Sequence, residues 1–453
     1  MAGTELTAPQ MAECVPLFHV DLGDVSKLVA MGGAAPDTAL AFSPDGKHLA
    51  IGSYNGEILI VDGFNGRLIR KRKLAETMIK KLLWAPNGKV LFAAEQSPDA
   101  YVHVLEVKSL ENIDRIRLAD LVGTSAVPPG EDLYGVYTLP AAHGLQTAAD
   151  GLLVAAVHAW NTDEGRQNAS RLVFINSEGQ SVASWPPDGA ASVTLMNPRV
   201  MGDKVAVPVG RSADGPAPDL PVNGVQLLQL PGLEPIRTFQ AEPLLPHYSQ
   251  VFLWETVDLG AEHLVMGATD GRVLVFPLAG GPPLTIDVGT PQILGGVPVV
   301  ATLGHTALAG NTVLALTSES SIPFGAAAPD LRPPSLHPNE NGLFAYGLEG
   351  TLRWTWRGAH APQGMTISAD GKTLVVGAGK RSSDDRRDLY GALVFDLTGT
   401  GSGDERLQTV CSTQGPVFFR QAVNQHGLIA VTEFPTLAAD GAVTGAYQVT
   451  VFR

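Results

Sequence analysis

The chain has 453 residues, a net charge of −14 and a pI near 5.2, and 45% of its residues are hydrophobic. This hydrophobic content excludes intrinsic disorder. The acidic balance argues against nucleic acid and anionic membrane surfaces as partners, because both require clustered Lys and Arg. The 50 glycines and 33 prolines exceed the usual share of turn formers, which indicates many short strands.

The first clear element is a run of three alternating strands joined by polar turns, FSPDGKHLAIGSYNGEILIVDGFNGRLI, from Phe42 to Ile69. Related copies are LLWAPNGKVLFAAE (Leu82 to Glu95) and TISADGKTLVVGAG (Thr366 to Gly379). Asp-Gly and Asn-Gly pairs between alternating apolar residues are the strongest short-range signal for a β-hairpin, since Gly accepts the positive φ of these turns. Sheet units that repeat every 45 to 70 residues or so predict an all-β fold of the β-propeller class.

The third strand of each unit is the easiest to locate, and we find eight. These strands start near Glu57, Tyr101, Arg171, Val225, Arg272, Leu343, Ala392 and Ala446. Alternation over such lengths is typical of half-buried strands, and no long stretch has helical periodicity. The sequence therefore predicts an eight-bladed β-propeller, with seven blades as the alternative.

The eighth unit ends at Arg453, directly after its third strand, whereas Leu17 to Leu22 is a β-like run that precedes the first blade. We predict that this N-terminal strand completes the last blade, because closure removes an open sheet edge. The alternative is that residues 1–35 form a loose tail. The predicted organisation is an N-terminal extension, 1–16, and a single propeller domain, 17–453. The predicted blades are 36–74, 78–120, 133–187, 190–241, 247–289, 292–357, 360–411, and 415–453 with 17–22.

The segments Phe42 to Arg67 and Thr366 to Phe395 resemble propellers of the WD40 and YVTN types. The stretch GLFAYGLEGTLRWTW, from Gly342 to Trp356, resembles one blade of the quinoprotein-like propellers, which usually have eight. The resemblance covers nearly the whole sequence as architecture. It identifies a superfamily and implies no particular activity, and most blades lack a terminal Trp-Asp, so the sequence resembles a divergent member.

The irregular segments fall in one class of loop. The links between second and third strands are long in five units, at His158 to Ser170, Gly210 to Gly224, Ser318 to Gly342, Gly379 to Gly391, and Glu433 to Gly445. Such links emerge on the face that also carries the links between blades, and repeat proteins often bind partners there. Neutral loop expansion, tolerated at low closure cost, is the alternative. The candidate partner-binding residues on this face are Glu95, His158, Trp160, Arg211, Asp270, Glu319, Arg381, Arg386 and Glu433.

The sequence contains no recognisable catalytic constellation. Its two cysteines, Cys14 and Cys411, form no CxxC motif, which excludes a c-type haem and a cysteine zinc site, and they pair only if the two ends of the protein meet. The motif GxSxG is absent. Quinoprotein dehydrogenases, as the resemblance implies, clamp their cofactor with Trp and vicinal cysteines; here no cysteines are adjacent, and the tryptophan docking motif occurs once, around Trp354 and Trp356. We therefore predict no catalytic residue, cofactor or metal.

These observations favour a non-catalytic propeller that binds a protein partner or assembles a complex through the face with long links. The alternative is an accessory or catalytic subunit of a redox complex that uses the central mouth. The first residues, MAGTELTAPQMAEC, include no signal peptide, and no apolar run reaches the ~18 residues of a membrane span. We expect a cytoplasmic protein without membrane insertion, or a periplasmic one if the sequence is that of a mature form.

Overall fold

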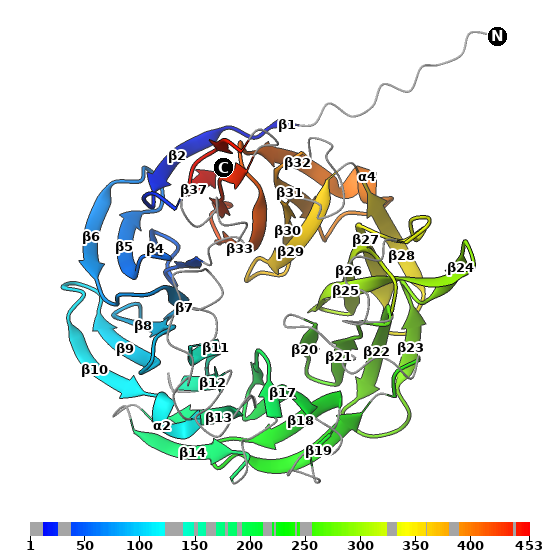
Figure 1. Cartoon of the computed structure of the whole chain (residues 1–453), viewed down its shortest axis with the longest axis horizontal. Coiled ribbons are helices and arrows are strands. Elements are labelled where there is room, and N and C mark those ends of the chain that lie inside the picture. Colours follow the sequence, from blue (N-terminus) through cyan, green and yellow to red (C-terminus); the bar gives the residue numbers. More distant parts are fainter. Residues whose placement is uncertain are drawn as a thin grey trace.

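In the computed structural model, the described strands form eight sheets of four or five strands that are arranged as a ring (Figure 1). The structure describes residues 12–25, 38–122, 139–148, 153–159, 169–176, 180–187, 193–211, 220–221, 223–240, 242–244, 256–323, 333–358, 360–379, 389–437 and 441–453. The fold is an eight-bladed β-propeller, as predicted. Each third strand begins within two residues of its predicted start.

Each blade has four strands in sequence order from the centre of the ring outward. Blade 1 consists of β3 Ala39–Phe42, β4 His48–Gly52, β5 Glu57–Asp62 and β6 Leu68–Lys73, and blade 2 of β7 Ile79–Trp84, β8 Val90–Glu95, β9 Tyr101–Glu106 and β10 Asn112–Arg117. Blade 3 consists of β11 Ala141–Thr147, β12 Leu153–Ala159, β13 Ala169–Ile175 and β14 Ser181–Trp185. Blade 4 consists of β15 Val193–Leu195, β17 Lys204–Arg211, β18 Asn223–Gln229 and β19 Glu234–Gln240. Blade 5 consists of β20 Val257–Leu259, β21 His263–Gly267, β22 Arg272–Pro277 and β23 Leu284–Asp287, and blade 6 of β25 Val297–Ala309, β26 Thr312–Ser321, β27 Gly342–Gly347 and β28 Leu352–Arg357. Blade 7 consists of β29 Ala361–Ile367, β30 Thr373–Gly379, β31 Gly391–Asp396 and β32 Leu407–Ser412. Blade 8 consists of β33 Val417–Val423, β34 Ile429–Glu433, β37 Gln448–Phe452 and, as its outer strand, β2 Pro16–Asp21.

Short elements add to this plan. β16 Arg199–Met201 pairs with β17, β24 Gln292–Leu294 pairs with β25, and β35 Thr436–Leu437 pairs with β36 Val443–Thr444. Two one-turn helices, α2 Ala119–Val122 and α4 Gly403–Arg406, lie among the described residues. No helix in that part of the protein has the length and apolarity of a membrane span.

The turn between the first and second strands repeats the same local chemistry in blades 1 and 7. In blade 1, Asp45 accepts a hydrogen bond of 2.7 Å from the Ser43 hydroxyl, and Gly46 adopts φ +72°. In blade 7, Asp370 accepts a 2.6 Å bond from the Ser368 hydroxyl. These bonds lower the pKa of both carboxyls, the serine hydroxyl being the largest cause. The Ser-x-Asp-Gly sequence thus fixes a tight hairpin through side-chain and backbone preferences together.

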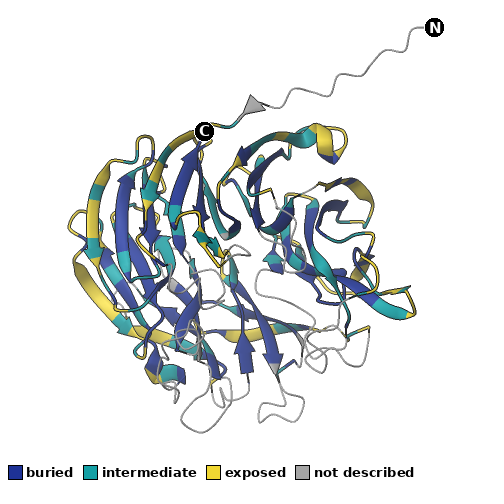
Figure 2. Cartoon of the chain, turned by 45° about the horizontal axis from the view of Figure 1, so that its top comes forward, coloured by how far each residue is buried: buried dark blue, intermediate teal, exposed yellow. Residues whose placement is uncertain are grey.

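The second and third strands of the blades are more buried than the fourth strands at the rim of the ring (Figure 2). In β5 the residues Ile58 to Val61 are buried, whereas no residue of β6 is fully buried. The buried residues form eight clusters among the described residues, and each cluster joins two neighbouring blades. Leu49 of blade 1, for example, packs in one cluster with Val449 of blade 8. Because every blade buries its two faces against neighbours, no blade has a core of its own.

The ring closes where the two ends of the described structure meet. β2 pairs antiparallel with β37, with His19 opposite Thr450, so the N-terminal segment supplies the fourth strand of blade 8 as predicted. Residues Ala12–Glu13 form β1, which adds a fifth, parallel strand to β32 of blade 7. Between β1 and β2, Cys14 forms a disulfide with Cys411, 397 residues away in the sequence. We call this arrangement of β1, β2, β32, β37 and the disulfide the seam.

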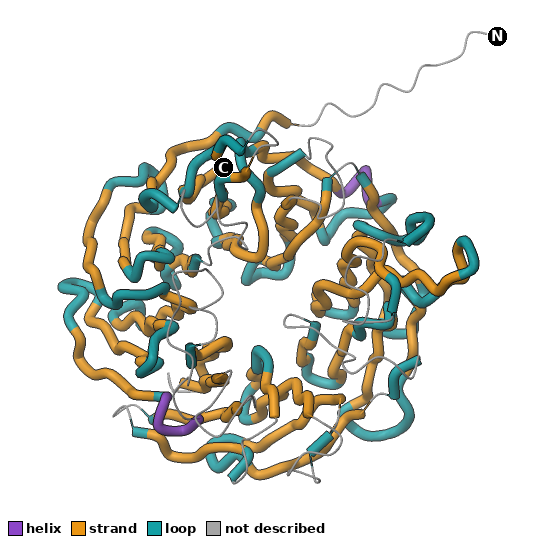
Figure 3. The backbone as a smooth tube through the Cα atoms, viewed as in Figure 1, coloured by secondary structure: helices purple, strands orange, loops and turns teal. Residues whose placement is uncertain are grey.

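One face of the ring carries the ends of the second strands and the starts of the third strands, and we call it the insert face. The five long links predicted from the sequence connect second to third strands in blades 3, 4, 6, 7 and 8. The links between blades reach the same face, because fourth strands run antiparallel to third strands. Links from third to fourth strands lie at the opposite face and are mostly short. Figure 3 shows the ring of strands with the loops that connect them.

Candidate functional site

The insert face is held from beneath by buried polar side chains, of which Glu95 at the end of β8 is the first. Glu95 is 6% exposed, and its carboxylate lies 2.9 Å from Nε2 of His103 on β9. The other ring nitrogen, Nδ1, lies 3.1 Å from the side-chain oxygen of Asn112 on β10. The hydroxyl of Ser97 donates to the same carboxylate. These contacts join three strands of blade 2 and satisfy a charge that would be unstable if buried alone.

Glu433 holds the corresponding position at the end of β34 in blade 8. One carboxylate oxygen accepts hydrogen bonds from the side chains of Gln448, at 3.1 Å, and Thr450. The other accepts the backbone N–H of Gln414 at 3.0 Å, in the link from blade 7. Thr450 also contacts Nδ1 of His19 at 2.8 Å, so this network reaches the seam strand β2. The carboxylate therefore ties the closing blade to the incoming link.

Asp270 lies just after β21 and is fully buried with Arg272 as its partner. The guanidinium donates twice, from Nε at 3.0 Å and from Nη2 at 2.7 Å. Asp270 also accepts the backbone N–H of Leu244 at 3.0 Å, and Arg272 donates to the carbonyl of Glu242 at 2.6 Å. Two parallel bonds with matched charge make a strong and directional pair. The pair fixes the link that enters blade 5.

The sequence predicted that these three carboxylates belong to a partner-binding face, and that role stays a prediction. They reach the expected face but lie below its surface. Asp270 and Glu433 anchor backbone of links between blades, whereas Glu95 is bonded to side chains within blade 2. Glu319 lies in β26, half-buried. His158 lies in β12 and Arg211 ends β17. Trp160, Arg381 and Arg386 lie outside the described residues, so their role on the face stays a prediction.

In blade 6 a histidine and an asparagine anchor the end of the insert. His337 is 1% exposed; its Nε2 donates to the carbonyl of Thr290 at 3.0 Å, and its Nδ1 accepts the N–H of Asn339 at 3.0 Å. The side chain of Asn339 donates to the carbonyl of Val288. Burial lowers the pKa of His337, which agrees with a neutral ring whose Nδ1 is an acceptor. Both anchored carbonyls belong to the link from blade 5.

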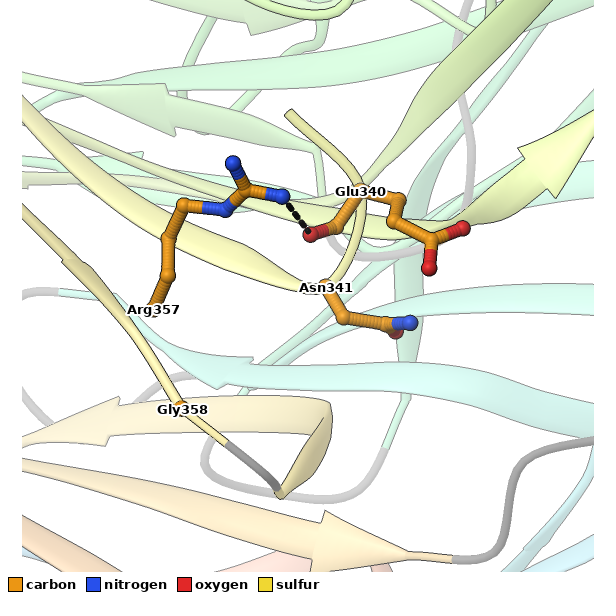
Figure 4. Close-up of a pocket in the computed structure, with 4 residues that line it drawn as sticks. All are labelled: Glu340, Asn341, Arg357 and Gly358. Atoms are coloured by element: carbon orange, nitrogen blue, oxygen red, sulfur yellow. Dashed lines mark hydrogen bonds between the residues drawn. The ribbon is translucent and has the colours of Figure 1, made fainter. Parts of the chain in front are cut away.

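Next to this anchor lies a cavity of about 270 Å³, lined by Glu340, Asn341, Arg357 and Gly358 (Figure 4). Its position follows from the pairing of Gly342 with Arg357, which brings the end of the insert beside the end of β28. Nη2 of Arg357 donates to the backbone carbonyl of Glu340 at 3.4 Å. The cavity therefore opens at the insert face and combines a guanidinium, a carboxylate and an amide.

A second cavity, of about 400 Å³, lies at turns between first and second strands, at the opposite face. It is lined by Arg199, Asp258, 307–310, 365–369 and 371. Asp258 accepts the N–H of Leu308 at 2.8 Å, and Arg199 lies 3.8 Å from its carboxylate. Among the described residues, no three His, Cys, Asp or Glu side chains are grouped so as to hold a metal ion.

Comparison with known proteins relates this fold to WD40 domains. Residues 35–87, which span blade 1 and the start of blade 2, match the family model of the anaphase-promoting complex subunit 4 WD40 domain. The chain is 28% identical over 116 residues to an uncharacterized WD repeat-containing protein of Schizosaccharomyces pombe; the match covers 25% of this chain and 19% of that protein. The C-terminal WD40 domain of Sif2 superposes with a TM-score of 0.57 at 11% identity, covering 98% of this chain and 99% of that one. The chain is an eight-bladed β-propeller with sequence similarity to WD repeat proteins.

A computationally designed protein, Ika8, has the same fold, with a TM-score of 0.54 and 13% identity over 92% of this chain and 96% of its own. The WD40 fold is typical of protein-interaction scaffolds. The sequence predicted none of the four residues that line the blade 6 cavity, Asn341 and Arg357 among them. Asn341 has φ +48°, which asparagine tolerates better than most residues, so the Asn-Gly pair at 341–342 was the available signal. Arg357 carried no signal, because one arginine at the end of a strand is common.

Proposed function

We propose that this WD40-like propeller is a protein-interaction module that binds its partner through the insert face. The observation that carries the proposal is the restriction of long links to one class: five blades have extended second-to-third links, whereas third-to-fourth links are mostly short. Loops elaborated on one face of a rigid scaffold are where repeat proteins commonly bind.

The anchoring beneath this face supports the proposal. Glu433, Asp270 and His337 each fix backbone of a link between blades. A surface held in this way loses little conformational freedom when a partner binds, and a preorganised surface binds more tightly for the same contact area. We expect the ring to stay intact when surface loops change, because the core clusters lie between blades and not in the loops.

The proposal is tested by exchanging loops on the two faces. In one variant, residues 324–332 of the blade 6 insert are replaced by a Gly-Ser linker of equal length, which leaves His337 and Asn339 in place. In the matched control, residues 280–283, the turn between β22 and β23 on the opposite face, are replaced in the same way. Immobilised proteins capture partners from a lysate of the source organism, and mass spectrometry quantifies them.

We expect both variants to retain the β-rich circular dichroism spectrum and the thermal midpoint of the unaltered propeller. The protein that the unaltered propeller captures specifically should be depleted only with the 324–332 variant. Full capture by that variant, together with loss in the 280–283 control, would assign binding to the opposite face and reject the proposal.

A further inference from the structure

The blade 6 cavity contains an amide without a protein partner. Asn341 is 4% exposed, and neither its side-chain nitrogen nor its side-chain oxygen makes a hydrogen bond. Its backbone N–H, by contrast, donates a hydrogen bond of 3.2 Å to the carbonyl of Ser318. Burying both halves of an amide without hydrogen bonds is unfavourable. A donor and an acceptor that lie side by side match the two groups of a peptide bond in another protein, after a small rotation of the side chain.

Arg357 supplies a cation at the mouth of the same cavity. Its side chain is exposed, makes one long hydrogen bond of 3.4 Å to the Glu340 carbonyl, and forms no ion pair with a described residue. By contrast, the guanidinium of Arg272 in blade 5 forms an ion pair with Asp270. In a protein of net charge −14, an arginine without a carboxylate partner remains open to an external anion.

The third polar group of the cavity, the carboxylate of Glu340, is bonded to Ser320. The carboxylate of Glu340 accepts hydrogen bonds from the N–H of Ser320, at 3.1 Å, and from its hydroxyl, at 2.6 Å. Through these bonds Glu340 joins the insert to β26, and Arg357 contacts its backbone carbonyl and not its carboxylate. The carboxylate therefore does not neutralise the guanidinium. The planar fork of Arg357 is suited to a carboxylate from outside, which it can bind through two hydrogen bonds.

We propose that the cavity between Asn341 and Arg357 is a subsite for an extended peptide segment that carries a carboxylate. Arg357 binds the carboxylate, and the amide of Asn341 pairs with a neighbouring peptide group. The carboxylate belongs either to an Asp or Glu side chain or to the C-terminus of the bound polypeptide. This inference rests on the proposed function, because it places one contact of a protein partner on the insert face.

The test uses the full-length propeller and positional-scanning arrays of decapeptides. One array has amidated C-termini and varies an internal position between Asp, Glu, Asn and Gln. The second has no acidic side chains and presents each peptide with a free and with an amidated C-terminus. Binding of fluorescently labelled propeller should be about tenfold stronger to acidic than to amide side chains on the first array, or to free than to amidated ends on the second. The responding array identifies the source of the carboxylate. Equal binding to charged and neutral peptides on both arrays would overturn the subsite.

Three variants assign the binding to these residues. Asn341→Gly removes the amide and suits φ +48°, so the fold should be kept while peptide binding falls about tenfold. Arg357→Gln should abolish the preference for carboxylates, and Arg357→Lys should restore part of it, since the charge returns without the planar fork. Arg353→Gln, on the same strand but bonded to Thr312, is the matched control and should bind as the unaltered propeller does.

Two outcomes separate this subsite from the broader function. If Asn341→Gly and Arg357→Gln leave carboxylate binding intact, the subsite is wrong, even where the 324–332 variant loses its partner. If that loop variant keeps its partner and the 280–283 control loses it, the insert face is wrong as the partner's main contact, whereas peptides that still require Arg357 leave the subsite itself standing.

Discussion

The seam and the insert of blade 6 both join residues that are distant in sequence, yet they are attached to the propeller in different ways. At the seam, β2 continues a sheet, and Phe18 and Val20 pack against the cluster between blades 8 and 1. The insert is attached through polar side chains, mainly His337 and Asn339, to carbonyls of a neighbouring link. The seam is therefore part of the framework, whereas we expect that the insert can change without loss of the ring.

The largest expected effect comes from removing the seam strand. Deletion of residues 1–25 removes β1, β2 and the disulfide, which leaves β37 as an open edge beside apolar residues. We expect an insoluble protein, or a thermal midpoint lowered by more than about 10 °C, in scanning calorimetry. Deletion of residues 1–11, which retains both strands, is the control and should melt like the full-length protein. Equal stability of the two deletions would show that β2 does not close the ring.

A smaller effect is expected from the disulfide alone. It links residues 397 positions apart, so it restricts the unfolded state strongly, and its removal should cost about 2–4 kcal/mol. A variant in which Cys14 and Cys411 are both replaced by alanine should melt several degrees lower than the oxidised protein. Reductant should lower the midpoint of the unaltered protein and leave the double variant unchanged. If reductant shifts neither protein, the hydrogen bonds of β2 suffice to hold the seam.

The state of this disulfide in the native cell also bears on where the protein is found. Disulfides persist in oxidising compartments and are rare in the cytosol of most organisms. A thiol-labelling measurement on cells that finds Cys14 and Cys411 paired would contradict the cytoplasmic location expected from the sequence. Free thiols would agree with it.

The buried network of Glu433 should matter more than an exposed ion pair of similar appearance. Glu433→Ala leaves the N–H of Gln414 and the hydroxyl of Thr450 without their acceptor inside blade 8, at a cost of about 1–3 kcal/mol. The matched control is Glu57→Gln, which breaks a partly exposed pair with Lys71 at 2.9 Å and should cost less than about 1 kcal/mol. Thermal midpoints measure both. Similar losses would mean that the network adds nothing specific to the seam.

The sequence predicted the framework but not the polar contacts beneath the insert face, and the reason is physical. Turn residues and alternating apolar residues act over a few positions. The copies at Phe42 to Ile69 and Thr366 to Gly379 therefore predicted their blades independently of the rest of the sequence. The closure of the ring by residues 17–22 could be predicted because the eighth unit has no fourth strand of its own. Whether a carboxylate such as Asp270 is exposed or buried depends on Arg272 and on the backbone of residues 242–244, which packing in three dimensions brings together.

The cavity of blade 6 shows the same limit. Asn341 and Arg357 meet because β27 and β28 pair in one register. The Asn-Gly pair marks Asn341 as a turn residue only, and nothing in the sequence marks Arg357. The pairing of the cysteines depended likewise on where the two ends of the protein lie. Local patterns thus predict which strands form, whereas the polar contacts between distant segments appear only with the assembled ring.

The smallest expected effect is a pH response confined to the insert. His337 is neutral in the folded protein, and burial lowers its pKa below the ordinary value of 6.5. The unfolded or detached segment therefore binds protons more readily, so the anchor is fully stable above about pH 6.5 and weakens as the pH falls through the lowered pKa of the folded state. Protonation of Nδ1 breaks its bond with the N–H of Asn339, while the core clusters between blades are unaffected. Hydrogen exchange, corrected for intrinsic rates, should show faster exchange of residues 333–341 at about pH 5.5 than at about pH 7.5, with no change in β5. His337→Gln, whose amide can donate to Thr290 and accept from Asn339, should remove the difference; a response that persists in this variant would assign the pH dependence to another group.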